Sequence, residues 1–240
     1  MKTFSITDTG VTREMNQDYY FATDTNLGNL PNLFSVADGM GGHKAGDYAS
    51  RHTIERVVAS ISRNSSEEPV TIIQEAISKA NELLVAESNE DETKSGMGTT
   101  LVIATLVGDK LIVANVGDSR LYVISDMVRQ ITRDHSLGDE MVRLGELNPS
   151  EARSHPDKNI ITRAIGAQKD VKADFFEVEL AKDDYVLMCT DGLTNMVRDE
   201  EILDIVHSEK EPEAIAHKLV RMANNNGGRD NITVTIIKPF

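Results

Sequence analysis

Cysteine is almost absent from this sequence. Cys189 is the only cysteine among 240 residues, so no disulfide can form within the chain. A single thiol suits a reducing compartment. Because Met1–Ile6 lacks a basic stretch followed by an apolar run, we expect no export and predict a cytoplasmic protein. The Asn-x-Ser/Thr matches at Asn64 and Asn231 are then chance matches rather than glycosylation sites.

Long apolar runs and a surplus of basic residues are also missing. No segment approaches the roughly 20 apolar residues that a membrane-spanning helix needs, so we expect no membrane insertion. Lys and Arg number 25 against 39 Asp and Glu, which gives a formal net charge of −14. That charge disfavours binding to nucleic-acid phosphates, and we expect no nucleic-acid partner.

The chain shows no linker rich in Pro, Gly and Ser and no internal repeat, so a single domain is expected. Strand patterns fill the first 37 residues, and apolar residues at helical spacing predict helices over 45–62 and 69–88. Residues 99–131 return to a strand pattern with a hairpin signal at Gly108-Asp109, which predicts a meander of about four strands.

The last third of the chain predicts a further helix pair between strands. Residues 174–190 supply two strands, and the second of the two following helices starts at Pro212. Ile232–Ile237 forms the final strand. Because strands occur in blocks separated by helix pairs, we predict an α+β fold with largely antiparallel sheets and helices on their outer faces.

Residues 138–160 differ from their surroundings, because they are polar and irregular. Within them we expect a short helical stretch at Met141–Leu144 and a helix start with Asn148 at the N-cap and Pro149 at the first helical position. Long excursions in compact domains are often functional. We interpret the segment as a flap, with a plain surface insertion as the alternative.

Four short segments place a carboxylate at the end of a predicted strand. Asp38-Gly39, Gly117-Asp118 and Asp191-Gly192 follow apolar runs, and Asp230-Asn231 precedes one. A single Asp-Gly pair is only a turn signal. If the strand ends converge, however, close like charges require proton uptake or a bound cation.

A hard divalent cation is the predicted resolution of that repulsion. The sequence has no Cys or His cluster with zinc spacing and no calcium-binding loop of the EF-hand type. Oxygen ligands favour Mg²⁺ or Mn²⁺. Two such ions bridged by one carboxylate activate water and clamp the oxygens of an in-line displacement at phosphorus. The residues alone therefore predict a hard-cation site with hydrolytic phosphoryl chemistry.

Five motifs occur in an order that a known family shares. They are Arg13-x-x-Asn16-Gln17-Asp18, Asp38-Gly39-Met40-Gly41-Gly42-His43, Gly117-Asp118-Ser119-Arg120, Thr190-Asp191-Gly192 and Asp230-Asn231. On these motifs the chain resembles the bacterial type-2C protein phosphatases, which are metal-dependent serine/threonine phosphatases, from Thr7 to Ile237. The resemblance implies a four-layer α/β/β/α sandwich of two central antiparallel sheets flanked by helix pairs, and one catalytic domain over residues 1–240.

The resemblance also implies the metal ligands. Asp38 would bridge two Mn²⁺ or Mg²⁺ ions, and the carbonyl of Gly39 would bind one of them. Asp191 and Asp230 would complete the protein ligands. Asp18 would hold metal-bound water.

Two further roles follow from the same resemblance. Asp118 would join Asp191 at the third ion that bacterial members often bind. Arg13 would grip the substrate phosphate, which suits the planar guanidinium because it makes two parallel charge-assisted hydrogen bonds.

Met40 marks a departure from the animal members of the family, which carry a histidine directly after the bridging Asp-Gly as the proposed acid. His43 could replace it or simply start the next helix, and we favour a metal-bound water as proton donor. The other histidines show no ligand spacing, and the Thr99-Thr100 pair is explained by small residues that begin a strand. No role is assigned to His52, His135, His155, His207 or His217.

The implied activity is hydrolysis of phosphoserine and phosphothreonine in proteins by a monomer, opposing a bacterial serine/threonine kinase and acting on its substrates. One alternative is a catalytically silent module that binds partners. Another is a two-metal phosphodiesterase. The joint presence of the predicted ligands argues against the first, and the lack of an evident basic groove argues against the second.

Overall fold

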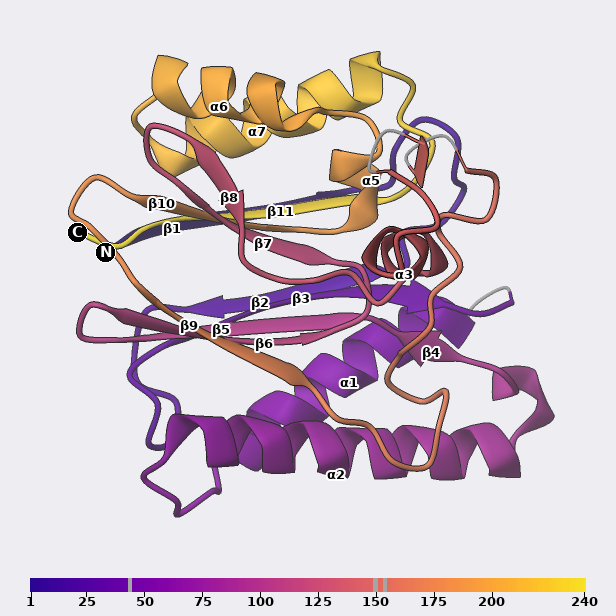
Figure 1. Ribbon diagram of the computed structural model, residues 1–240. Helices are drawn as coiled ribbons and strands as arrows, with labels where there is room; N and C mark the ends of the chain where they lie inside the picture. Colours follow the sequence, from indigo (N-terminus) through magenta and orange to yellow (C-terminus); the bar gives the residue numbers. More distant parts are fainter. Residues whose placement is uncertain (43–44, 149–150, 153–154) are drawn as a thin grey trace.

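Two antiparallel sheets lie face to face between two pairs of helices (Figure 1). The structure is a computed structural model and describes residues 1–42, 45–148, 151–152 and 155–240. The layers follow the order helices, sheet, sheet, helices. The predicted α+β sandwich is therefore confirmed.

The six-stranded sheet carries the first helix pair on its outer face. Its strand order is β2-β3-β5-β6-β9, with β4 paired to β3. Helices α1 (Ala45–Ile61) and α2 (Pro69–Glu90) bury their apolar stripes against it, as the 3.6-residue spacing predicted. The strands are β2 (Asp18–Thr23), β3 (Leu33–Met40), β4 (Gly98–Thr99), β5 (Leu101–Val107), β6 (Lys110–Val116) and β9 (Asp174–Glu179).

The five-stranded sheet carries the second helix pair. Its order is β1-β11-β10-β7-β8. Helices α6 (Asp199–Ser208) and α7 (Pro212–Asn225) cover it, and α7 begins at Pro212 as predicted. The strands are β1 (Lys2–Asp8), β7 (Arg120–Ile124), β8 (Val128–Gln130), β10 (Tyr185–Cys189) and β11 (Ile232–Lys238).

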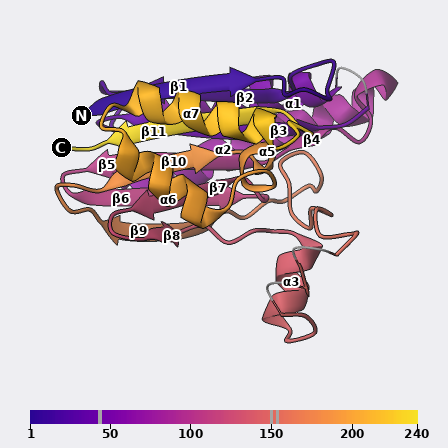
Figure 2. The ribbon, with the colours of Figure 1, turned by 90° about the horizontal axis from the view of Figure 1, so that it is seen from above.

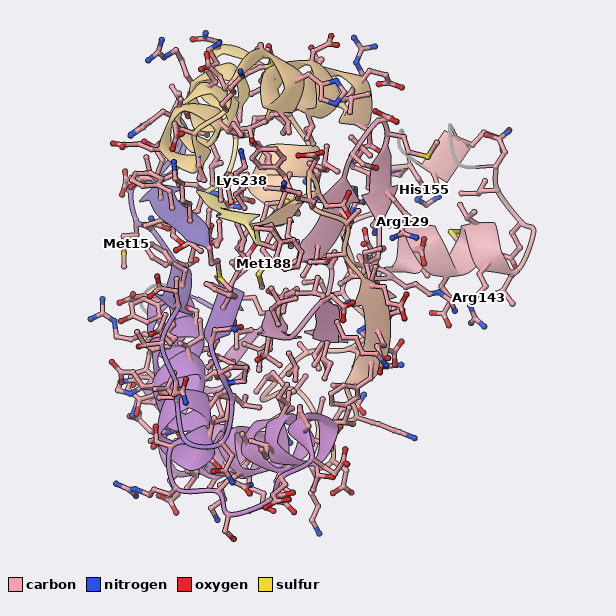
Figure 3. The ribbon with its side chains drawn as sticks, turned by 90° about the vertical axis from the view of Figure 1, so that its left-hand side faces the viewer. Met15, Arg129, Arg143, His155, Met188 and Lys238 are labelled. Carbon is pink, nitrogen blue, oxygen red and sulfur yellow. The ribbon has the colours of Figure 1, made fainter. Side chains whose placement is uncertain are left out.

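The layer between the sheets is apolar over most of its length. Phe34 and Val36 of one sheet and Leu121 and Met188 of the other are buried in it, and Figure 3 shows Met188 between the sheets. Each large apolar side chain buried there stabilises the fold by about 1.5–3 kcal/mol. This layer fixes the distance between the sheets.

The segment 99–131 is not one meander, which corrects the prediction. The Gly108-Asp109 hairpin forms, with Val107 paired to Lys110, but β5 and β6 belong to one sheet while β7 and β8 belong to the other. The chain crosses between sheets just after β6, at Gly117. A Cβ on Gly117 would lie 2.6 Å from the Thr100 side chain, and its φ is +105°, so only glycine fits this crossing.

The predicted flap projects from the side of the sandwich (Figure 2). Its helix α3 spans Leu137–Arg143 and starts earlier than the predicted Met141, because the Ser136 hydroxyl caps it by accepting from the Asp139 amide at 3.3 Å. Asn148 Oδ1 accepts from the Glu151 amide at 3.0 Å, as expected of an N-cap. Pro149 lies outside the described residues.

Two short helices were not predicted. A 3-10 helix at Glu92–Lys94 follows α2, and α5 (Asp191–Thr194) follows β10. Within the described residues, no helix has the length and apolar character needed to cross a membrane.

Candidate active site

Asp18 and Asp38 face one another from neighbouring strands. They are direct partners in the β2–β3 register. Asp38 lies inside β3 rather than after it, because the strand continues through Gly39 and Met40, which pair with β4. The Asp38 backbone is fixed on both sides by Thr100, whose hydroxyl accepts from the Asp38 amide at 2.8 Å and whose amide donates to the Asp38 carbonyl at 2.9 Å. Two acids are thus held side by side by the sheet itself.

Asp191 and Asp230 come from the other sheet. Asp191 is the first residue of α5, directly after β10 and Thr190, and Asp230 lies just before β11. Asn195 Nδ2 donates to Asp191 Oδ2 at 2.8 Å. Both acids therefore sit on short connecting segments rather than within a strand.

The glycines after Asp38 and Asp191 are required by close packing rather than by a turn. A Cβ on Gly39 would lie 2.0 Å from the Gly46 carbonyl oxygen, and a Cβ on Gly192 would lie 1.9 Å from the Asn231 carbonyl oxygen. Neither glycine has a positive φ. In both Asp-Gly pairs the glycine therefore lets the backbone beside the aspartate approach a second segment of backbone closely.

The acids of the two sheets act on one another electrostatically. Burial raises the pKa of Asp38 well above its usual value, and the charges of Asp18 and Asp191 raise it further. Burial raises the pKa of Asp18 to about 7, although its hydrogen bonds lower it. Burial and the charge of Asp230 raise the pKa of Asp191 to about 6, although the charge of Arg120 and the hydrogen bond from Asn195 lower it. The four predicted acids therefore converge.

Asp118 lies at the crossing between the sheets, next to this cluster. It is buried, and burial followed by the charges of Asp191 and Asp134 raises its pKa well above the usual value. His135 holds Gly117, the residue before Asp118. Its Nδ1 accepts from the Gly117 amide at 3.0 Å, and its own amide donates to the Gly117 carbonyl at 2.9 Å. His135, to which the sequence assigned no role, supports the Asp118 turn.

Arg13 reaches the cluster from the loop between β1 and β2. Its Nη2 donates to Asp230 Oδ2 at 2.8 Å, and half of the side chain is exposed. Asn231 holds this loop, since its Nδ2 donates to the carbonyls of Thr9 and Met15 at 2.9 Å each, and its Oδ1 accepts from the Gln17 amide at 2.8 Å. Asn231 belonged to a predicted motif, but its role was not foreseen.

A pocket of about 410 Å³ lies between two of the acids and the flap. Asp118 and Asp191 line one side, and Asp139, Val142 and Lys158 of the flap region line the other. Figure 3 shows the flap standing out from the sandwich, with Arg143 and His155 on it. Asp118 and Asp191 therefore open onto a pocket that the flap borders.

The oxygens at this site suit a hard cation. Asp18 Oδ1 and Asp191 Oδ1 are buried, and neither has a hydrogen-bond partner, which is costly for a carboxylate unless a cation binds. Among the described residues, no three Asp, Glu, His or Cys side chains already surround one point as metal ligands do. Arg13 donates to Asp230 Oδ2 and Asn195 donates to Asp191 Oδ2. The donor set fits Mg²⁺ or Mn²⁺.

Comparison with known proteins agrees with this chemistry. The family model described as protein phosphatase 2C matches residues 10–232. The chain belongs to the protein phosphatase 2C family. As a member of it, the chain is a metal-dependent serine/threonine protein phosphatase that acts on phosphoproteins. The resemblance inferred from the five motifs is confirmed.

The matches to individual relatives cover nearly the whole of this protein phosphatase 2C chain. The serine/threonine phosphatase stp of Listeria monocytogenes is 40% identical over 237 residues, covering 97% of this chain and 93% of that protein. The crystal structure of Stp1 from Staphylococcus aureus matches with a TM-score of 0.91 at 35% identity, covering 98% of this chain and 93% of that one. The catalytic domain of PstP, solved with 2 manganese ions, matches with a TM-score of 0.86 at 30% identity, covering 98% of this chain and 96% of that one.

The sequence assigned no role to two threonines of this protein phosphatase 2C site, Thr233 and the Thr190 of the Thr190-Asp191-Gly192 motif. Thr190 and Thr233 are fully buried, and both hydroxyls donate to Asp18 Oδ2, at 2.8 and 2.7 Å. Each stands within three residues of a motif aspartate, Asp191 or Asp230. That proximity was a usable signal, but strand-forming threonines are too common for it to stand out.

Proposed function

We propose that this phosphatase hydrolyses phosphoserine and phosphothreonine monoesters at a centre of two Mn²⁺ or Mg²⁺ ions, with a third ion beside it. The observation that carries the proposal is the convergence of buried acids that raise one another's pKa. When bound, the ions activate water and neutralise the phosphate. The catalytic unit is a single domain over residues 1–240.

The proposed ligands come from both sheets. Asp38 would bridge the two ions, Gly39 would offer its carbonyl, and Asp191 and Asp230 would complete the set. Asp118, which is buried and lines the same pocket as Asp191, would share the third ion with it. Asp18 would act through water, since its Oδ1 is buried and has no hydrogen-bond partner.

Arg13 would bind the substrate phosphate. Its guanidinium is half exposed and already contacts Asp230, so it stands at the entrance to the acids. Its planar fork matches two phosphate oxygens.

The leaving serine or threonine oxygen needs a proton. Met40 follows the Asp-Gly pair, and its thioether carries no proton to donate. His43 lies outside the described residues. We therefore assign the proton to a water of the site.

The proposed setting is the cytoplasm, where the buried free thiol of Cys189 stays reduced. The partners would be a serine/threonine kinase and its phosphorylated substrates, met by a monomer. The flap beside the pocket would contact the residues that flank the phosphorylated side chain.

A phosphothreonine peptide tests the reaction. We expect phosphate release with Mn²⁺ or Mg²⁺ and none once a chelator is in excess. Release that persists in chelator would rule out the metal mechanism. No release under any condition would indicate a silent binding module, and preference for a nucleotide diester over the peptide would indicate a phosphodiesterase.

Arg13→Lys tests the phosphate contact. Loss of a paired charge-assisted contact worth about 1.5–3 kcal/mol should lower kcat/KM roughly tenfold or more. Arg221→Lys, on the exposed side of α7, is the matched control. Equal kcat/KM values for the two variants would contradict the assignment.

A further inference from the structure

The two carboxylate oxygens of Asp18 differ in their hydrogen bonds: Oδ2 accepts two, and Oδ1 accepts none. Thr190 Oγ1 and Thr233 Oγ1 both donate to Oδ2, at 2.8 and 2.7 Å. Oδ1 is buried without a partner among the described residues. Because Asp18 belongs to the six-stranded sheet and both threonines follow or form strands of the five-stranded sheet, these bonds join the two sheets at the acidic end.

With Asp18 Oδ2 as an acceptor, the direction of each hydrogen bond in this network follows. Each threonine hydroxyl has one proton, and those of Thr190 and Thr233 go to Asp18. The Thr7 hydroxyl, 2.8 Å from that of Thr233, must then donate to it. Thr7 in turn accepts from Asn16 Nδ2 at 2.8 Å. The chain of donors runs one way, from Asn16 to Asp18.

The network also returns to the backbone of Asp18. Asn16 Oδ1 accepts from the Asp18 amide at 3.1 Å, and Asn16 lies on the loop that carries Arg13. Thr190 Oγ1 further accepts from the Thr233 amide at 3.0 Å. The side chain of Asp18 is thereby held at one oxygen, and its orientation is tied to the loop that would bind phosphate.

We propose that Thr190 and Thr233 are positioning residues, which hold Asp18 Oδ2 so that Oδ1 alone serves the metal centre. The inference rests on the proposed function of Asp18. Outer partners of this kind orient ligands and alter metal affinity by roughly 10- to 100-fold when they are removed. The threonines themselves take no part in bond making.

The same strand offers a matched control. Thr235 Oγ1 bonds Ser5 Oγ at 2.9 Å, two positions further along the β1–β11 register than the Thr7 and Thr233 pair. Thr235 is fully buried, as Thr233 is. Removal of its hydroxyl perturbs the same sheet by the same chemical change, without a carboxylate partner.

The test compares Thr233→Val, Thr233→Ser and Thr235→Val. Binding of Mn²⁺ is measured from the electron paramagnetic resonance signal of the free ion, and kcat and KM are measured with a phosphothreonine peptide. We expect Thr233→Val to weaken Mn²⁺ binding and to lower kcat, each about tenfold, with KM unchanged. Thr233→Ser, which keeps the hydroxyl, should restore both, and Thr235→Val should match the parent protein.

Two results would overturn the proposal. One is Thr233→Val with the Mn²⁺ affinity and kcat of the parent. The other is an equal loss in Thr235→Val, which would indicate a general packing effect. If Thr233→Val does not fold, Thr7→Val interrupts the same series of hydrogen bonds one step earlier. It should weaken Mn²⁺ binding by less than the roughly tenfold expected of Thr233→Val. An unchanged Mn²⁺ affinity in Thr7→Val would contradict the proposal. A parent protein that binds Mn²⁺ but releases no phosphate would refute the proposed function alone, since the binding comparison would stand.

Discussion

The two sheets contribute their carboxylates in different ways. Asp18 and Asp38 are paired within the ladder of the six-stranded sheet, so their separation is set by strand geometry. Asp191 and Asp230 lie on short segments at the ends of strands of the five-stranded sheet. Their orientation depends on side-chain donors, Asn195 and Arg13.

One site therefore combines a rigidly held pair of acids with a pair that can adjust. The strand-borne pair cannot move apart, so the fold itself enforces the repulsion that a cation relieves. Asp191 and Asp230 lie outside the strand ladders, so we expect their side chains to rotate when a donor is exchanged for an ion. We therefore expect changes in the first pair to be severe and changes around the second to be graded.

Replacement of a strand-borne acid should have the largest effect. Asp38→Asn should lower phosphatase activity by more than the roughly 100-fold that loss of an outer partner can cost. It should also raise the unfolding temperature of the metal-free protein, because a buried carboxyl whose charged form is disfavoured becomes a neutral amide. Activity is measured as phosphate release at saturating Mn²⁺, and stability as thermal unfolding in chelator. Asp109→Asn, in the exposed β5–β6 turn, should change neither, and an active Asp38→Asn enzyme would refute the distinction.

Removal of a donor to a loop-borne acid should have a moderate effect. Asn195→Ala frees Asp191 Oδ2 from its 2.8 Å hydrogen bond, and the half-saturating Mn²⁺ concentration should change by about tenfold at most. Activity at saturating Mn²⁺ should stay close to that of the parent. Asn29→Ala, whose side chain bonds the Ser66 carbonyl on a distant loop, is the control. Inactivity at every Mn²⁺ concentration would show that the second pair is as rigid as the first.

A change of pH acts on both pairs and leaves every side chain in place. Folding raises the pKa of Asp18 from 3.8 to about 7 and that of Asp191 from 3.8 to about 6. The folded protein therefore holds these protons more tightly than the unfolded chain, and stability is lost as pH rises through this window. In chelator, the free energy of unfolding should fall between about pH 4 and pH 7, by at most about 1.4 kcal/mol per pH unit for each carboxyl, and the unfolding temperature should fall with it.

Asp18→Asn should flatten that dependence. With excess Mn²⁺ the trend should reverse, since ligands must lose their protons to bind the ion. A metal-free protein whose unfolding temperature rises over the same pH range would contradict the assigned shifts.

The fold was predictable where a residue pattern is compatible with only one kind of local structure. Helical spacing in α1 and α2, and Pro212 at the start of α7, determined those elements from local sequence. The distribution of β5 to β8 over two sheets was not predictable, because hydrophobic strand patterns do not specify which sheet a strand joins. The crossing at Gly117 is visible only through its contact with Thr100.

The site was predictable at its acids but not at their supports. Asp38 and Asp191 stand out because a charge directly after an apolar run is unusual. The roles of Thr190, Thr233 and His135 do not stand out, since each is an ordinary residue for a strand or turn, even though Thr190 belongs to a predicted motif. Their contacts arise from pairings between segments far apart in the chain, which no local pattern records.

The pairing of β1 with β11 has a consequence for how the enzyme is made. Arg13 follows the first strand and Asp230 precedes the last, and 217 residues separate them. At about 5–20 residues per second, a ribosome adds that stretch on the order of 10 s or more after Arg13. Until β11 emerges and pairs with β1, the Arg13 loop, which we propose binds phosphate, has no Asn231 to hold it. A nascent chain should therefore be unable to dephosphorylate its neighbours, and activity should begin only once the whole sandwich has closed.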